Sequence, residues 1–251
     1  MQLIGDIVRK TGEPSLLAVE AAKASRAFEI GRNSGLFSVP KVIHFDDEAG
    51  ALEFERLSDL VTLLDLAVRE DSRLPELLKQ TGQALATVHK KLILPEDMKH
   101  ELPLGWMAPS GENVFIHGDF ASINVCFHEP SYELVLLDWS AAPLVGRTPT
   151  FGSRYFDILL FISSLFHGAP WRRAFNWNAK EMADIFLRGY RKVAPEVRLD
   201  NFKNYSSQIC QLQRINIRQL AAQRKTLRAI GFVCHQMFMN VRLWLFLNGY
   251  Q

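Results

Sequence analysis

The spacing of apolar residues divides the chain into a mixed first part and a mainly helical remainder. Residues 3–9 are predicted to form a strand, and apolar residues recur at helical spacing from Ser15 to about Arg32, with Gly35 following as a stop signal. Residues 39–45 and 51–57 are predicted as two strands joined by a polar turn that ends in Gly50. These elements together predict a small α+β lobe.

Beyond residue 58 the pattern is mostly of helical period. Helices are predicted over residues 60–69, 74–92, 153–166, 178–194, 200–228 and 229–248, and short strands over 114–117, 124–127 and 133–137. The chain divides most naturally near Ser58 and Asp59. We therefore expect a lobe of residues 1–58 and a larger, mainly helical lobe of residues 59–251.

The segment with the richest chemistry reads Phe-Ile-His-Gly-Asp-Phe-Ala-Ser-Ile-Asn over residues 115–124. Its H-x-D spacing, with Asn124 five residues after Asp119, is that of the catalytic loop H-R-D-x-x-x-x-N of kinases. Phosphoryl transfer needs a carboxylate that accepts the proton of the attacking hydroxyl, and an oxygen ligand for the metal on the phosphates. Polar loops between strands also contain Asp and Asn for turn reasons alone, so this motif by itself leaves both interpretations open.

A second segment, residues 134–139, is an apolar strand that ends in a single carboxylate, Asp138, followed by Trp139. A carboxylate at the end of a buried strand is held rigidly, and it is the type of oxygen ligand that Mg²⁺ prefers. Asp119, Asn124 and Asp138 are expected to meet at one point, because the two segments form a strand, a loop and a strand. The combination is far more specific than either segment alone.

The two segments together resemble the aminoglycoside phosphotransferase and choline kinase branch of the protein-kinase-like fold, in which the loop reads H-G-D-x-x-x-x-N and the metal-binding strand ends in D-W or D-x-E. Weaker similarities extend the resemblance to about residues 8–195; they lie at residues 39–42, 53–57, 85–89 and 156–159. The resemblance implies an α+β, two-lobed kinase-like fold with a reduced N-terminal lobe, and ATP and Mg²⁺ in the cleft between the lobes.

The resemblance also implies roles for particular residues. Asp119 is expected to be the catalytic base and Asn124 and Asp138 the Mg²⁺ ligands, while the backbone from Glu55 to Leu57 would lie against the adenine. Lys10 and Glu20 are the best candidates for the pair that holds the α- and β-phosphates. Lys10 could equally be a solvated strand end, and Glu20 one of several carboxylates on a helix surface.

The sequence departs from the family pattern at its start. Only nine residues precede Lys10, whereas a phosphate-covering hairpin needs two strands of about five to six residues, and no G-x-G-x-x-G occurs. Three explanations stay open: the sequence begins late, another loop grips the phosphates, or nucleotide binding has decayed. The expected function is transfer of the γ-phosphoryl of ATP to a hydroxyl of a small molecule; the alternative is a catalytically weak or inactive kinase-like protein that binds nucleotide or a partner.

The amino-acid composition is consistent with the expected fold and function. The 251 residues are 48% hydrophobic and 22% charged, which excludes a disordered chain, and the formal charge of +2 is too small to favour a nucleic-acid partner. Three widely spaced cysteines, with no C-x-x-C, fit a reducing compartment and argue against a zinc site. No export signal is visible in residues 1–10, so we expect a cytoplasmic protein. The oligomeric state is not predicted.

Several side chains have a simpler interpretation than catalysis. His117 is expected to fix its loop, His89 to be a core histidine, Trp139 to pack, and Asp157 to cap a helix and support the catalytic loop. Residues 230–250 are interrupted by polar side chains, so we expect a buried terminal helix there and no membrane span. A basic cluster could attract an anionic substrate or membrane headgroups, but a solvated face is favoured; it comprises Arg214, Arg218, Arg224, Lys225 and Arg228.

Overall fold

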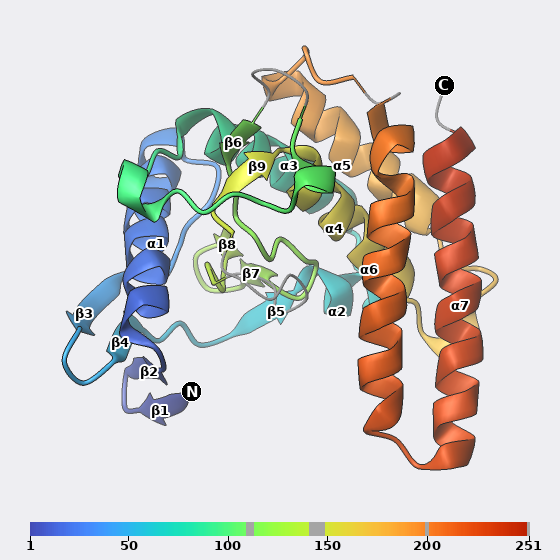
Figure 1. Ribbon diagram of the computed structural model, residues 1–251, viewed down its shortest axis with the longest axis horizontal. Coiled ribbons are helices and arrows are strands. Elements are labelled where there is room, and N and C mark those ends of the chain that lie inside the picture. Colours follow the sequence, from blue (N-terminus) through green and yellow to red (C-terminus); the bar gives the residue numbers. More distant parts are fainter. Residues whose placement is uncertain (109–112, 141–148, 199–200, 250–251) are drawn as a thin grey trace.

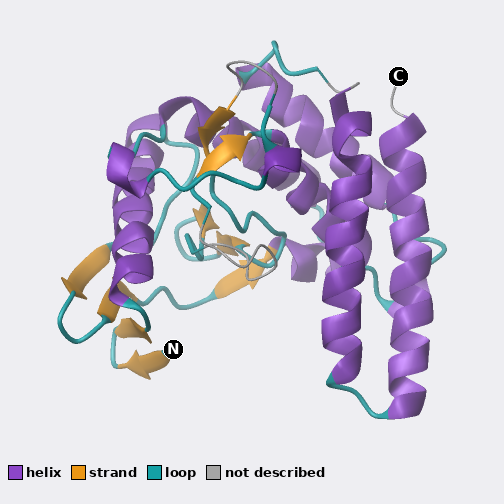
Figure 2. Cartoon of the chain, viewed as in Figure 1, coloured by secondary structure: helices purple, strands orange, loops and turns teal. Residues whose placement is uncertain are grey.

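The computed structural model describes residues 1–108, 113–140, 149–198 and 201–249. A small antiparallel sheet and one helix form the N-terminal region, and a mostly helical part follows (Figures 1 and 2). The predicted α+β architecture, with a small sheet region ahead of a helical part, is thereby confirmed.

The N-terminal sheet has the strand order β1-β2-β4-β3, and its neighbouring strands are antiparallel. The strands are β1 (Gln2–Ile4), β2 (Ile7–Thr11), β3 (Val42–Asp46) and β4 (Ala51–Glu55). The prediction of one strand over residues 3–9 was wrong, because Gly5 adopts a left-handed φ of 57° and folds the segment into a hairpin. Lys10 therefore lies on the second strand of a short hairpin.

Helix α1 (Pro14–Ser34) packs against β3 and β4 of this sheet. Pro14 starts it at a position where its missing N–H costs nothing, and Gly35 ends it in the left-handed conformation with φ 65°. One face of the helix is buried, and this face carries the charged residues Glu20 and Lys23 among alanines and leucine. Charged side chains on the buried face of a helix need partners there.

Two further strand groups hold the loop singled out in the sequence. The first is a sheet of β5 (Leu60–Thr62), β7 (Val125–His128) and β8 (Glu133–Leu136), and the second pairs β6 (Asn113–Phe115) with β9 (Phe151–Ser153). The predicted helix over residues 60–69 was wrong in its first turn, since Thr62 caps the shorter helix α2 (Leu63–Arg69) through a hydrogen bond from the Asp65 amide. Strand β9 was not predicted.

The backbone of Ser38, between α1 and β3, ties the N-terminal region to β8. The Ser38 amide donates to the Leu134 carbonyl at 2.7 Å, and the Leu136 amide donates to the Ser38 carbonyl at 2.9 Å. These bonds place α1 and the N-terminal sheet close to the end of β8, where Asp138 follows.

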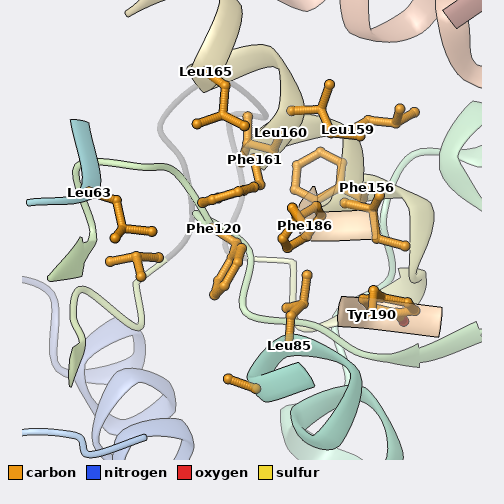
Figure 3. Close-up of a cluster of buried hydrophobic side chains, with 14 of the residues drawn as sticks. Leu63, Leu85, Phe120, Phe156, Leu159, Leu160, Phe161, Leu165, Phe186 and Tyr190 are labelled. Atoms are coloured by element: carbon orange, nitrogen blue, oxygen red, sulfur yellow. The ribbon is translucent and has the colours of Figure 1, made fainter. Parts of the chain in front are cut away.

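The helical part consists of α3 (Leu74–Lys91), α4 (Tyr155–His167), α5 (Ala179–Val193), α6 (Phe202–Ala222) and α7 (Thr226–Gly249). Helix α4 is apolar on almost every face and lies in the middle of the core, where Phe161 packs against Phe120 and Phe186 (Figure 3). Helices α3 and α5 approach closely at Gly82 and Gly189, because neither has a side chain at the crossing.

Helices α6 and α7 lie side by side as a long hairpin at the edge opposite the N-terminal sheet (Figure 1). The chain turns at residues 223–225, a few residues before the boundary that the sequence predicted. The expectation that α7 is a buried core helix was wrong: Phe238 and Trp244 are exposed, and only its inner face is buried. Among the described residues, α7 is the one helix that is long and apolar enough to cross a membrane.

Candidate active site

The loop from His117 to Asn124 connects β6 to β7, and its backbone is hydrogen-bonded to the side chain of Asp157 in α4. The carboxylate of Asp157 accepts hydrogen bonds from the amides of His117 at 2.7 Å and Gly118 at 2.9 Å. His89 of α3 also contacts it, through Nε2 at 2.9 Å, and the other ring nitrogen of His89 lies 2.8 Å from the Tyr190 hydroxyl. The expected support of the loop by Asp157 is present, but its side chain does not cap α4.

His117 fixes the loop from within. Its ring lies next to the ring of Trp139, its Nε2 is 3.2 Å from the Leu137 carbonyl oxygen, and its Nδ1 is 3.3 Å from the Asp119 amide. Burial lowers the pKa of His117 to about 4, so the imidazole is neutral near pH 7. The neutral ring, with one nitrogen donating and the other accepting, fits both contacts.

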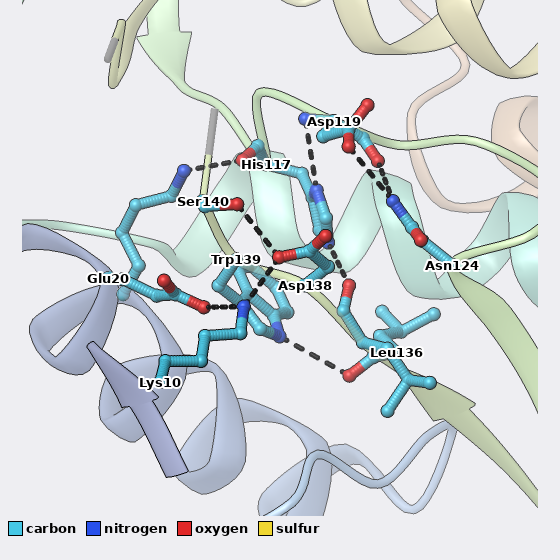
Figure 4. Close-up of polar contacts among 11 residues, drawn as sticks. Lys10, Glu20, His117, Asp119, Asn124, Leu136, Asp138, Trp139 and Ser140 are labelled. Carbon is cyan, nitrogen blue, oxygen red and sulfur yellow. Dashed lines mark hydrogen bonds and ion pairs between the residues drawn. The ribbon is translucent and has the colours of Figure 1, made fainter. Parts of the chain in front are cut away.

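Asp119 and Asn124 contact each other across the loop (Figure 4). The Asn124 amide nitrogen donates to the Asp119 backbone oxygen at 3.0 Å and to its carboxylate at 3.1 Å. Burial, and in second place the charge of Asp138, raises the pKa of Asp119 to about 6. A carboxylate with such a pKa is a better proton acceptor near neutral pH than an ordinary aspartate.

Asp138 follows the end of β8 in an unusual backbone conformation. Its φ is 56°, in the left-handed region that a residue with a side chain rarely adopts. One carboxylate oxygen accepts hydrogen bonds from Ser140 Oγ and from Lys10 Nζ, each at 2.7 Å. Backbone strain of this kind is often found at functional sites, where the surroundings impose it.

Lys10 of β2 and Glu20 of α1 form an ion pair of 2.5 Å. Burial by itself would lower the pKa of Lys10, but the carboxylates of Glu20 and Asp138 outweigh it and the pKa is raised. Glu20 is almost fully buried, which excludes the interpretation of a surface carboxylate. The structure therefore brings together Lys10, Glu20 and Asp138, which lie 10 and 118 residues apart in the chain.

Lys23, one turn after Glu20 on α1, is a part of the site that sequence reasoning missed. Its side chain is fully buried, and its ammonium donates a hydrogen bond to the His117 carbonyl oxygen. Burial lowers the pKa of Lys23 to about 8, although the charges of Asp157, Glu20, Asp119 and Asp138 oppose the shift. The sequence held no clear signal for it, because Lys23 lies outside the predicted apolar face of Leu17, Ala21, Ala24 and Phe28.

A cavity of about 290 Å³ opens between the N-terminal sheet and the end of β8. Glu55 and Leu57, the residues expected against an adenine, lie in its wall together with Lys10, Asn124 and Asp138. The rest of the wall is mostly apolar: Met1, Val8, Val39, Pro40, Phe54, Leu60, Leu137 and Trp139, with Glu20. Asp119 is not part of this wall, although it contacts Asn124, which is.

The donor set at this cavity fits a hard divalent cation. The second carboxylate oxygen of Asp138 and the amide oxygen of Asn124 accept no hydrogen bond within the described part of the chain, and oxygen ligands of this type suit Mg²⁺. No group of three His, Cys, Asp or Glu side chains that could hold a metal ion occurs in the described ranges. Within the described residues, the chain therefore offers two free oxygen atoms at this cavity, one from Asp138 and one from Asn124.

The sequence matches no protein-family model, and no curated protein matches it. Among the solved structures that it resembles is a choline/ethanolamine kinase family protein from Mesorhizobium loti, with 16% sequence identity and a TM-score of 0.57 over 98% of this chain and 88% of that one. A glucosamine kinase has 13% identity and a TM-score of 0.60 over 96% and 73% of the two chains. The chain has a protein-kinase-like fold.

An amicoumacin kinase, solved with AMP-PNP and Ca²⁺, shares this fold with 14% identity and a TM-score of 0.54 over 94% of this chain and 80% of that one. The kinase-like fold expected from the H-G-D and D-W motifs is confirmed by these likenesses. They cover nearly the whole kinase-like chain, beyond the residues 8–195 over which the motifs extend.

Proposed function

We propose that this kinase-like chain is an ATP- and Mg²⁺-dependent phosphotransferase that moves the γ-phosphoryl of ATP to a hydroxyl of a small molecule. The observation that carries the proposal is the meeting of Lys10, Glu20 and Asp138 beside the contact between Asp119 and Asn124 (Figure 4). These charges come from the sheet, α1 and two loops, and holding them together at one partly buried point has a cost that a structural role alone does not explain.

Each group has a task in the proposed reaction. Asp119 orients the acceptor hydroxyl and takes its proton while the oxygen bonds to the γ-phosphorus and the bond to the bridging oxygen of ADP breaks. Asn124 and Asp138 would hold Mg²⁺, which when bound neutralises charge on the phosphates. Lys10, oriented by Glu20, would bind the α- and β-phosphates. Its present contact with Asp138 must then lengthen.

The apolar wall of the cavity is proposed to take the adenine. The amide of Glu55 donates to the Lys41 carbonyl, and the amide of Arg56 donates to the Asp6 carbonyl. Both of these amides are therefore already hydrogen-bonded. Of the three backbone amides from Glu55 to Leu57, all within the described residues, that of Leu57 is the one left to donate to a ligand. We assign recognition of the adenine edge to Leu57 and its neighbouring carbonyls.

Nucleotide binding is tested by thermal unfolding with ATP, with and without Mg²⁺. A ligand at about 100 times its Kd stabilises the folded state by about 2.7 kcal/mol, which raises Tm by about 5 to 10 °C for a chain of this size. We expect the Mg²⁺-dependent part of the shift to disappear in Asp138→Ala and to persist in Asp97→Ala, an exposed carboxylate outside the cavity. No shift at millimolar nucleotide contradicts the proposal.

Catalysis is tested separately by ADP release with a panel of hydroxyl acceptors that includes choline, glucosamine and amicoumacin, the molecules named for the similar structures. Asp119→Asn should lower turnover by about 10²-fold or more while the ATP-induced shift stays. Full activity in Asp119→Asn refutes the role of the base. Nucleotide binding without turnover by any acceptor favours the alternative, a kinase-like protein that binds nucleotide without transferring phosphoryl.

A further inference from the structure

Helix α7 leaves a long apolar stripe uncovered. Its inner face packs against α4 and α6 and buries Met239, Leu243 and Leu247. Its outer face carries seven exposed apolar side chains at helical spacing, named here the α7 stripe: Leu227, Ile230, Met237, Phe238, Val241, Trp244 and Leu245. A helix that is apolar on both faces is normally buried on both, so a contiguous exposed stripe of this length indicates a surface that binds something.

Two exposed aromatic residues from the loop after α4 widen the stripe. Phe175 is 83% exposed and packs its ring against Phe238, with ring centres 5.1 Å apart. Trp171 is 64% exposed and lies against His235, with ring centres 5.4 Å apart. Aromatic side chains of this kind are favoured at membrane–water interfaces, because the ring is apolar and the indole N–H is polar.

The last fifty residues of the chain carry basic side chains and no acidic ones. Of the 29 Lys and Arg residues, seven lie between residues 201 and 251, and none of the 27 Asp and Glu does. The whole chain carries only +2, so the two-helix hairpin is strongly basic while the rest is net acidic. Such a distribution attracts an anionic surface to one side of the molecule.

Cations flank the α7 stripe on both sides. Toward α6, Arg214 and Arg218 line a hollow together with Met237 of the stripe. Toward α5, a groove of about 1130 Å³ includes Leu245 of the stripe, one carboxylate, Asp184, and five basic side chains: Lys180, Arg188, Arg191, Lys192 and Arg242. At the turn of the hairpin, residues 224, 225 and 228 are basic and exposed.

An apolar and aromatic stripe between two rows of cations is the pattern of a helix that lies in the interface of an anionic membrane. A second copy of this chain would bring like charges together along the same stripe. We propose that the hairpin of α6 and α7 docks this protein on anionic phospholipid bilayers, with the α7 stripe among the acyl chains and the arginines at the phosphates. This docking does not depend on phosphoryl transfer.

Docking on the surface differs from crossing the bilayer. The buried side of α7 is occupied by α4 and α6, and Arg242 donates hydrogen bonds to the carbonyls of Ala174 and Trp177. The hairpin also stands at the edge of the molecule, with its turn away from the helical core (Figure 1). The side chains of the α7 stripe are exposed and can therefore contact a flat surface. Only the outer face of α7 needs to enter the interface.

The test is co-sedimentation of the full chain with vesicles of phosphatidylcholine alone, or of phosphatidylcholine mixed with phosphatidylglycerol. We expect binding to the anionic vesicles that weakens with salt, and little binding to the neutral ones. Tryptophan emission should shift to shorter wavelength, because Trp171 and Trp244 are the exposed ones and Trp106, Trp139 and Trp177 are buried.

Matched variants separate the contribution of the cations to vesicle binding from that of the apolar α7 stripe. Arg214→Gln with Arg218→Gln should lower the partition coefficient about 25-fold, at about fivefold per cation, and Trp244→Ala with Leu245→Ala should lower it about tenfold or more. The controls are Lys91→Gln at the last residue of α3 and Ile93→Ala just beyond it, both exposed, which should leave vesicle binding unchanged. Equal binding to both vesicle types, loss in the controls, or a dimer that buries Trp244 and leaves the vesicles unbound would overturn the proposal.

Discussion

Lys23→Met tests the reasoning about the buried charges at the site. Lys23 is fully buried, and burial lowers its pKa from 10.5 to about 8. At pH 7 the ammonium is therefore still charged in the folded protein, and the lowered pKa corresponds to a penalty of about 3 kcal/mol relative to the unfolded chain.

The sign of the pH effect follows from which state binds more protons. Below pH 8 both the folded and the unfolded states hold the proton on Lys23, so the whole penalty is present. Between pH 8 and 10.5 the unfolded chain binds more protons than the folded one, so this contribution to stability rises with pH. The stability of the wild type relative to Lys23→Met should increase by about 2 kcal/mol from pH 8 to pH 10.

Urea denaturation at pH 7, 8, 9 and 10 measures this difference, since Met has no charge and a volume similar to that of the lysine stem. Lys91→Met, on the surface, is the control and should give a difference that does not change with pH. A flat difference for Lys23→Met would refute the argument, because it would mean that the carboxylates around Lys23 fully compensate its burial.

Two further predictions concern the scaffold. Gly189→Ala should lower the free energy of unfolding by about 3 kcal/mol or more in urea, because a Cβ there would lie 2.0 Å from the Lys79 carbonyl oxygen, whereas Gly231→Ala, with open space around it, should be neutral or stabilising. Asp157→Asn should lower turnover at least about tenfold and lower the free energy of unfolding by about 1 to 3 kcal/mol, because the loop amides of His117 and Gly118 lose an ionised acceptor. If the free energy of unfolding falls by this amount and turnover is unchanged, Asp157 has a structural role alone.

Local motifs and hydrophobic periodicity predicted most of the helices and the residues of the candidate site. The spacing of Asp119, Asn124 and Asp138 indicated the loop and the strand that present them, and the long helices of the second part were predicted within a few residues of their ends. The roles of these residues stay predictions, but their proximity is observed. Errors occurred at short elements, such as β1 and β5, because two or three residues contain too little of a period to identify a strand.

The sequence by itself determined the type of fold and the chemical groups available at the site, because local spacing and turn chemistry are written in neighbouring residues. Only the tertiary structure decided that Lys10 and Glu20 are paired, that Lys23 is buried against the loop from His117 to Asn124, and that the outer face of α7 is exposed. These properties depend on contacts between segments far apart in the chain. A charge on a helix or an apolar residue in a repeat looks the same in sequence whether another segment packs over it or not.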